Sequence, residues 1–206
     1  MRYVSVVALA LSALFGAAGA GILPPAEVTP EIVAERGCIE GVSHPSEEAL
    51  NFDAQAKACD DYVRLRAGDA DARRMRAWHY YDHGSERIHF EIAYEQLSDL
   101  IKAGEGKAVD YYYRGHLLAL KFGQPRAAIA DYDAAILLRQ DSPRAQYHFA
   151  RAAMHLQLGD AAQDPAELRA GIADLEMVKA LGKDNARVAE HMAWAKHLLN
   201  RLEQVN

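Results

Sequence analysis

The chain has 206 residues, of which 50% are hydrophobic and 25% are charged, and its formal net charge is −6. This is the composition of a folded domain rather than of a disordered chain. The acidic balance argues against nucleic-acid binding, which requires a basic surface. Threonine occurs only at Thr29 while alanine is frequent, and this bias favours helices over strands.

Residues 1–20 have the three parts of a secretory signal peptide. A short positive segment with Arg2 precedes an apolar run over residues 4–17, and an Ala-Gly-Ala cleavage site ends at Ala20. The alternative is a membrane anchor helix, but the apolar run is short for a bilayer span and two prolines follow it closely. The sequence therefore predicts export, to a bacterial periplasm or out of the cell, with cleavage after Ala20.

Two cysteines, Cys38 and Cys59, belong to the part of the chain that would be exported. An even number of cysteines in an exported protein suggests a disulfide. A bond with this separation is worth about 3 kcal/mol in the loop-entropy model; the alternative is two buried free thiols. Residues 21–36 form a proline-rich leader, and Cys59 lies in a helix expected to begin at Ser46. The bond would tie the leader segment to that helix.

The rest of the chain alternates amphipathic helices with turns that contain glycine or proline. A short helical turn over residues 31–36 is expected to end at Gly37, and the helix from Ser46 is expected to end near Gly68. A polar loop is expected after Gly159. The later predicted helices cover residues 69–82, 90–101, 108–122, 127–138, 144–158, 166–181 and 184–202.

Two stretches of the sequence recur. Tyr-Tyr-Arg-Gly at residues 112–115 aligns with Tyr-His-Phe-Ala at 147–150, and Ile-Ala-Asp-Tyr-Asp at 129–133 aligns with Ile-Ala-Asp-Leu-Glu at 172–176. The distance in sequence between the second pair of stretches is larger than that between the first pair, which we attribute to an enlarged turn after Gly159. A period near 34 residues built from helix pairs is typical of helical repeats, whose units bury their apolar faces by stacking.

Residues 111–143 resemble the tetratricopeptide repeat family. The matching features are tyrosines and a glycine in the first helix, a glycine at the turn and a small-large-small pattern in the second helix, carried by Gly115, Gly123, Ala128, Tyr132 and Ala135. The resemblance implies an all-α fold in which antiparallel helix pairs stack as a short right-handed solenoid over residues 37–206. It places repeats at about 69–103, 108–142 and 143–182 and a capping helix at 185–202.

The sequence departs from the family pattern at several places. No helix carries the full Trp-x-x-Leu-Gly start, the first repeat has extra residues around 85–88, and the third has a long turn over residues 160–168. The second repeat has one extra residue between Gly115 and Gly123. These departures concern the geometry of the repeats more than the fold class.

In this family the first helix of each pair lines a concave groove, so the resemblance also implies a binding face. Aromatic and cationic residues, which often anchor interfaces, dominate the implied stripe. The alternative is that these aromatics belong to the core, because an error of one residue in register would move them there. The implied groove residues are Arg74, Trp78, Tyr112, Tyr113, His116, Arg144, Tyr147, His148, Arg151, Arg187, His191 and Trp194, with Asp71, Met75, Val109 and Glu190 on the same stripes. The Lys and Asn residues of the family's carboxylate clamp are absent.

A metal site is a further hypothesis, because His79 and His83 are spaced to lie on one helix face. The residue after His79 is Tyr80, so the HExxH motif is not present, and a surface or capping role is the simpler interpretation. The sequence contains neither a GxSxG nucleophile elbow nor a complete phosphate-binding loop. We therefore expect no catalysis, no metal and no cofactor.

The sequence predicts a protein–protein interaction module that binds a peptide or protein partner in a concave groove, in the bacterial cell envelope. One alternative is a structural subunit of a periplasmic complex that is held by its convex face. Another is a metal-binding protein or enzyme that uses His79 and His83.

Overall fold

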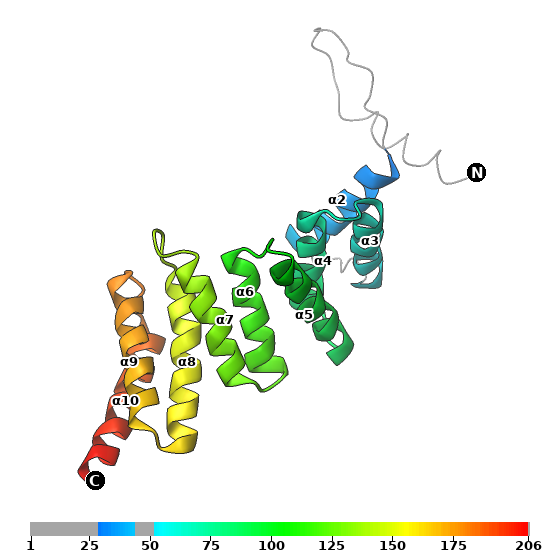
Figure 1. Cartoon of the computed structure of the whole chain (residues 1–206). Coiled ribbons are helices and arrows are strands. Elements are labelled where there is room, and N and C mark those ends of the chain that lie inside the picture. Colours follow the sequence, from blue (N-terminus) through cyan, green and yellow to red (C-terminus); the bar gives the residue numbers. More distant parts are fainter. Residues whose placement is uncertain (1–28, 44–51, 206) are drawn as a thin grey trace.

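The structure, a computed structural model, describes residues 29–43 and 52–205, and over these residues it is helical with no strand (Figure 1). The predicted signal peptide, residues 21–28 of the predicted leader and the expected helix start at Ser46 lie outside the described residues. The elements are α2 (Pro30–Ser43), α3 (Phe52–Leu65), α4 (Ala70–His83), α5 (Arg87–Lys102), α6 (Ala108–His116), η1 (Leu117–Lys121), α7 (Pro125–Leu137), α8 (Ala145–Ala162), α9 (Pro165–Ala180) and α10 (Ala186–Val205).

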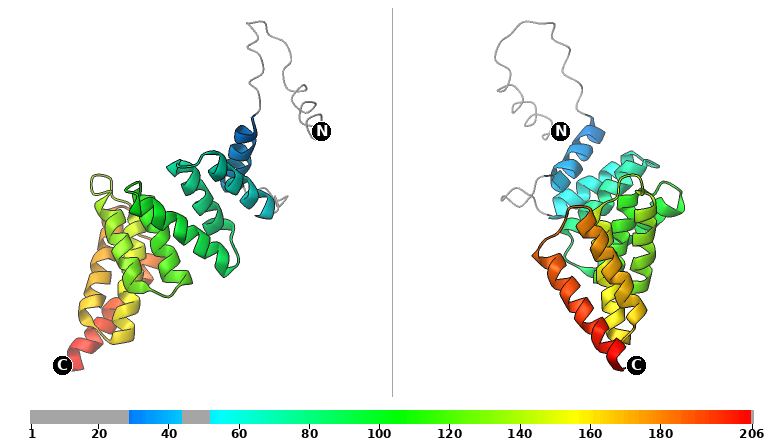
Figure 2. Two further views of the ribbon diagram at one scale, coloured as in Figure 1. Left: turned by 45° about the vertical axis from the view of Figure 1, so that its right-hand side comes forward. Right: turned by 90° about the vertical axis from the view of Figure 1, so that its left-hand side faces the viewer.

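The helices pack in sequence order. Helices α2 and α3, α4 and α5, α6 and α7, and α8 and α9 form four hairpins, each hairpin also contacts the next, and α10 packs on α9. Figure 2 shows the chain advancing from α2 and α3 at one end to α9 and α10 at the other. The predicted fold class, an all-α stack of antiparallel helix pairs, is confirmed.

Local sequence explains where several helices begin. Asp69 caps α4, because its carboxylate accepts hydrogen bonds from the main-chain N–H groups of Asp71 and Ala72 at 2.8 and 3.2 Å. Helices α7 and α9 each begin with a proline, whose missing N–H costs nothing in the first turn. Gly123, in the turn before α7, has a φ of 64°, which explains why glycine is needed there.

Two glycines that were expected to end helices lie inside them instead. Helix α2 continues through Gly37 to Ser43, and α8 continues past Gly159 to Ala162. An added Cβ at Gly159 would lie 2.8 Å from the Leu168 side chain, and one at Gly37 would lie 2.9 Å from Ala58. These glycines are needed for close helix packing and not for a turn, so the expected loop after Gly159 is wrong, and the turn itself is short.

The extra residue of the second repeat is accommodated inside the first helix of that repeat. Between α6 and the turn at Gly123 the chain forms a π-helical turn, η1, in which the Phe122 N–H donates to the Leu117 carbonyl at 3.0 Å. A hydrogen bond over five residues takes up one residue more than an α-helical bond. The predicted helix over 108–122 is therefore continuous but not uniform.

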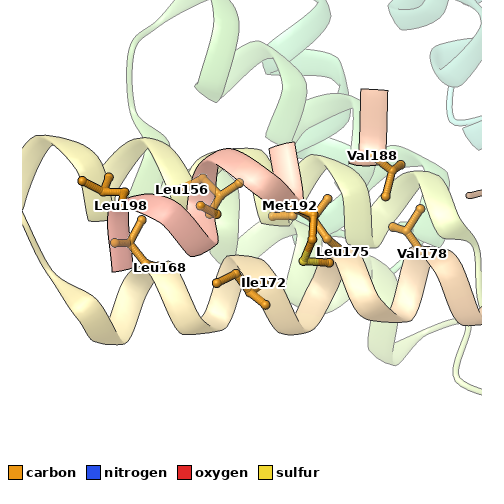
Figure 3. Packing of buried hydrophobic residues seen from close by; sticks show 10 residues of the cluster. Leu156, Leu168, Ile172, Leu175, Val178, Val188, Met192 and Leu198 are labelled. Atoms are coloured by element: carbon orange, nitrogen blue, oxygen red, sulfur yellow. The ribbon is translucent and has the colours of Figure 1, made fainter. Parts of the chain in front are cut away.

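The core is divided into clusters along the stack. The largest lies among α8, α9 and α10, is purely aliphatic, and interdigitates as Figure 3 shows; it contains Ala152, Leu156, Leu168, Ile172, Leu175, Val178, Val188, Met192, Ala195 and Leu198. Gly171 allows the Leu156 side chain to approach, since a Cβ there would lie 2.6 Å from it. Each layer buries its apolar face against its neighbours, as stacked repeats require.

At the opposite end a disulfide joins the first hairpin. Cys38 of α2 and Cys59 of α3 are both fully buried, with an S–S distance of 2.02 Å. The predicted pairing is therefore present in the structure. Among the described residues, no helix has the length and apolar character needed to cross a bilayer.

Candidate functional site

The face of the stack that is formed by α4, α6, α8 and α10, the first helices of their repeats, carries a line of aromatic rings. Tyr81 of α4 lies 4.7 Å from Tyr113 of α6, measured between ring centroids, and Tyr112 of α6 lies 4.9 Å from Tyr147 of α8. Phe149 of α8 continues the line to α10, with His191 at 5.6 Å. We call this line the aromatic ladder. Its ring pairs join α4 to α6, α6 to α8 and α8 to α10.

The part of the ladder between α4 and α6 is closely packed. Trp78 contacts Tyr113 at 6.1 Å, and the hydroxyl group of Tyr81 lies 2.9 Å from Nδ1 of His116. Burial raises the pKa of Tyr81, Tyr112 and Tyr113 and lowers the pKa of His116. These groups are therefore held in their neutral forms, and this part of the face is filled by uncharged rings.

A hollow of about 780 Å³ opens where the ladder passes from α6 to α8 and the start of α10. Its floor is apolar, with Phe149, Ala150, Met154, Val178 and Val188 among the lining residues. Its rim carries three cations, Arg144, Lys183 and Arg187. We call it the cationic hollow.

The rim cations have no carboxylate partner among the described residues. Arg144 and Lys183 make no ion pair there, and Arg187 lies 5.0 Å from the Phe149 ring centroid in a cation–π contact. No acidic side chain of the described chain lines the cationic hollow. The nearby Arg139 and Arg144 charges oppose the burial that raises the pKa of Tyr147. The hollow is thus locally positive in a chain with a net negative charge.

A second hollow, of about 410 Å³, adjoins the first between α8 and α10. It is lined by Ala153, Leu156, Gln157, Glu190, His191 and Trp194, and we call it the Trp194 hollow. Ala153 lines both hollows. Trp194 is 43% exposed, and its side chain is accessible at the wall of this hollow. Together the two hollows make a groove that follows α8.

Most of the predicted groove residues line these hollows or the filled part of the ladder. Arg144 and Arg187 are exposed on the rim, Trp194 and His191 line the Trp194 hollow, and Tyr112 and His116 line the cationic hollow. Trp78 and Tyr113 are half-buried between α4 and α6.

Four predicted groove residues are placed differently, because they are held inside or between repeats. Arg74 is 2% exposed, and its Nε donates to both carboxylate oxygens of Asp110 at 2.8 and 2.9 Å. His148 lies 3.0 Å from Asp174, and Arg151 donates to the same carboxylate at 2.7 and 2.8 Å. The fourth, Tyr147, is 5% exposed. These side chains stabilise the stack and do not face the hollows.

The buried carboxylates recur with the repeat. Asp131 and Asp174 occupy equivalent positions in the Ile-Ala-Asp motif, and each accepts a pair of hydrogen bonds from an arginine of the preceding first helix. The donors, Arg114 and Arg151, are not at aligned positions. The Ile-Ala-Asp motif therefore predicts which aspartate accepts the hydrogen bonds but not which arginine donates them. This explains why Arg151 was expected in the groove.

His79 lies inside the fold, which overturns the expected surface or capping role for this residue. It is fully buried, stacks on Phe52 at 5.1 Å, and neither ring nitrogen has a hydrogen bond of acceptable geometry. Burial, together with the nearby His83, lowers the pKa of His79 to about 4, and the Phe52 main chain opposes this shift. The part of the chain that is described holds no group of three or more potential metal ligands.

Sequence reasoning missed several residues that shape the groove. Phe149 aligns with Arg114 in the repeat and so was not assigned to the binding stripe, and Lys183 lies in a turn that no helical stripe covers. Ala119 and Leu120 reach the cationic hollow from the π-helical turn. The only sequence signal for them was the one-residue insertion.

Comparisons with protein-family models, with curated protein sequences and with solved structures find no match for this chain. The functional argument therefore depends on the geometry of the groove.

Proposed function

We propose that this protein is a tetratricopeptide-like interaction module that binds an extended segment of a partner protein along α8. The observation that carries the proposal is the groove itself, in which two adjoining hollows have apolar lining residues and three rim cations form no ion pair with a carboxylate of residues 29–43 or 52–205. Interfaces typically combine an apolar centre with aromatic and arginine anchors. The repeat period of the sequence and the order of the hairpins support a stacked-repeat scaffold.

An extended ligand fits the shape of the site better than a compact one. The hollows are joined at Ala153 and together follow the α8 face from Arg144 to Gln157. At 1.5 Å per helical residue this path is about 20 Å long, which an extended peptide of about six residues would span.

We further propose that the protein acts in the cell envelope after export. The support is the signal-like sequence over residues 1–20 together with the buried Cys38–Cys59 disulfide, since such bonds persist mainly in oxidising compartments. The intact mass of non-reduced protein from the native envelope tests this. A mature chain that begins after Ala20 and lacks two hydrogens supports the proposal, and an uncleaved or reduced chain contradicts it.

Selection from a random peptide library tests the interaction proposal directly. The wild-type protein is compared with Ala153→Arg, which places a long charged side chain where the two hollows meet. Its matched control is Ala173→Arg, at an exposed position on α9. We expect peptides to be enriched on wild type and Ala173→Arg and lost on Ala153→Arg, with all three proteins melting within a few degrees of each other. No enrichment on wild type, or equal enrichment on Ala153→Arg, would contradict the proposal.

A second candidate is a structural subunit held through the second helices. Leu137 and Leu138 at the end of α7 and Met177 of α9 are 67%, 53% and 43% exposed. Cross-linking in cells distinguishes the two functions. If Leu137→Glu with Met177→Glu abolishes the cross-links and Ala153→Arg leaves them intact, this candidate replaces the first.

A further inference from the structure

The two ends of the groove differ in chemistry, and this difference limits what can bind. The cationic hollow carries Arg144, Lys183 and Arg187 and is lined by no carboxylate of the described chain. The Trp194 hollow has an apolar wall of Leu156 and the exposed Trp194 ring. A segment in the groove therefore meets positive charge at one end and apolar surface at the other.

The acidic side chain of Glu190 strengthens this polarity. It lines the Trp194 hollow and makes no ion pair with another described residue. An acidic ligand group placed there would be repelled, whereas the same group beside Arg144 and Lys183 would be attracted. The charges thus favour one placement of an acidic ligand group over the other.

The spacing follows from the helix that forms the floor. Arg144 immediately precedes α8 and Leu156 lies twelve positions later on the same helix. This corresponds to about 18 Å along the axis, or about five residues of an extended peptide. Phe149 and His191 lie in contact between the two hollows and leave less room there for a bulky ligand side chain.

We infer that the ligand is an extended peptide in which acidic residues are separated by about five positions from a bulky apolar residue. The acidic residues lie beside Arg144, Lys183 and Arg187, and the apolar residue lies against Trp194. This inference rests on the proposed function and specifies its partner. The ligand must carry both the acidic residues and the apolar residue, and this requirement distinguishes it from a simple polyanion.

Fluorescence anisotropy with synthetic peptides tests the inference. The parent peptide contains two aspartates, a four-residue Gly/Ser spacer and one phenylalanine, and its reversed sequence is measured beside it. Three variants replace the aspartates by asparagine, replace the phenylalanine by serine, or shorten the spacer to one residue. We expect the parent or its reverse to bind at least tenfold more tightly than every variant, with an affinity that falls as salt rises.

Protein variants locate the two elements. Arg144→Glu with Lys183→Glu is expected to weaken the parent peptide at least tenfold while leaving the asparagine variant unchanged. Trp194→Ala is expected to weaken the parent at least fivefold while leaving the serine variant unchanged. The charge control is Lys102→Glu on α5, where an exposed lysine lies outside both hollows, and it should leave all affinities as in wild type. Circular dichroism and melting temperature confirm that each variant is folded.

The inference is overturned if neither parent nor reverse binds more tightly than the three variants, or if Lys102→Glu weakens binding as much as the double rim variant. It is also overturned if poly-aspartate binds as tightly as the parent. In each case the peptide library still tests the proposed function separately. If the library yields peptides of another chemistry whose binding is lost on Ala153→Arg, the proposed function still stands and only the inferred ligand chemistry is wrong. If the library yields no binder at all, both the proposed function and the inferred ligand chemistry are contradicted.

Discussion

The two ends of the stack are built from different side chains. Helices α3 to α6 bury aromatic rings and polar groups together, including Tyr80, Phe90, His79 and the Arg74–Asp110 pair. Helices α8 to α10 bury an aliphatic core and leave their shared face open as two hollows. Aromatic rings fill this face between α4 and α6, whereas an aliphatic core lies beneath the open groove between α8 and α10. The comparison teaches that the same face of a helical stack can be filled by aromatic rings in one part and left open as hollows in another.

The largest effect is expected from Asp110→Ala in the polar end. Asp110 is fully buried and accepts two hydrogen bonds from Nε of the buried Arg74, so its removal leaves that nitrogen without an acceptor and leaves Asp71 as the remaining ion-pair partner of the guanidinium. We expect a loss of about 3–5 kcal/mol in the free energy of unfolding, measured by urea denaturation. The double variant Arg74→Met with Asp110→Leu should recover most of this loss. A loss below about 1 kcal/mol for Asp110→Ala would show that the polar end does not depend on this pair.

The second effect is the pH dependence that His79, at the polar end, gives to the stability of the fold. The folded state keeps His79 neutral because its pKa is lowered from 6.5 to about 4, whereas the unfolded chain binds a proton near pH 6.5. As the pH falls from about 6.5 to 4, the unfolded state takes up a proton that the folded state does not, and stability is lost, by up to about 3 kcal/mol.

The His79→Phe variant isolates this contribution. Its free energy of unfolding should be less sensitive to pH between 7 and 4 than that of wild type, because the titrating group is gone. His83, His89 and Asp60 also act on the His79 charge and remain in both proteins, so the difference between the two curves reports His79 alone. Parallel curves would contradict the prediction.

The third test pairs one aromatic from each end. Tyr113 is half-buried in the filled part of the ladder, in contact with Trp78 and Tyr81, and Tyr113→Ala should cost about 2 kcal/mol of stability. Trp194→Ala, at the open end, should cost less than about 1 kcal/mol, because Trp194 is 43% exposed and lines an open hollow. Thermal melts measure both. Equal losses would mean that Trp194 is a core residue and that the groove is not preformed.

The smallest effect is expected at the surface of the aliphatic end. Arg169 of α9 and Glu203 of α10 form an ion pair with exposed side chains. Glu203→Ala should change the free energy of unfolding by less than about 0.5 kcal/mol, because exposed pairs contribute little. Leu168→Ala is the matched contrast, since it removes a fully buried side chain of the same helix pair. If Glu203→Ala lowers the free energy of unfolding more than Leu168→Ala does, then the aliphatic core is not what holds α10 against α9.

The fold was predictable because its signals are local. Helical spacing, capping residues such as Asp69 and the recurring Ile-Ala-Asp motif each act over a few residues or one repeat. Gly159 misled the prediction, because a glycine needed for close packing looks the same in a sequence as one needed for a turn. Only the position of Leu168 on the facing helix separates the two possibilities.

The groove was predictable only in part. The stripe rule selected Arg144, Arg187 and Trp194, but it also selected Arg74 and Arg151, which are held by Asp110 and Asp174. A long side chain such as arginine turns toward the nearest unpaired carboxylate, and that carboxylate lies 36 positions away for Arg74 and 23 for Arg151. Such a pairing depends on tertiary distance, which helical periodicity does not encode.

The π-helical turn Leu117–Lys121 has a consequence for how this site can evolve. One inserted residue in an α-helix would rotate everything after it by about 100°, but here the wider turn takes up the insertion before α7 begins. The same turn places Ala119 and Leu120 at the wall of the cationic hollow. A one-residue insertion can thus change the wall of the cationic hollow while α7 still packs on both α6 and α8, a kind of surface change that point substitution alone does not provide.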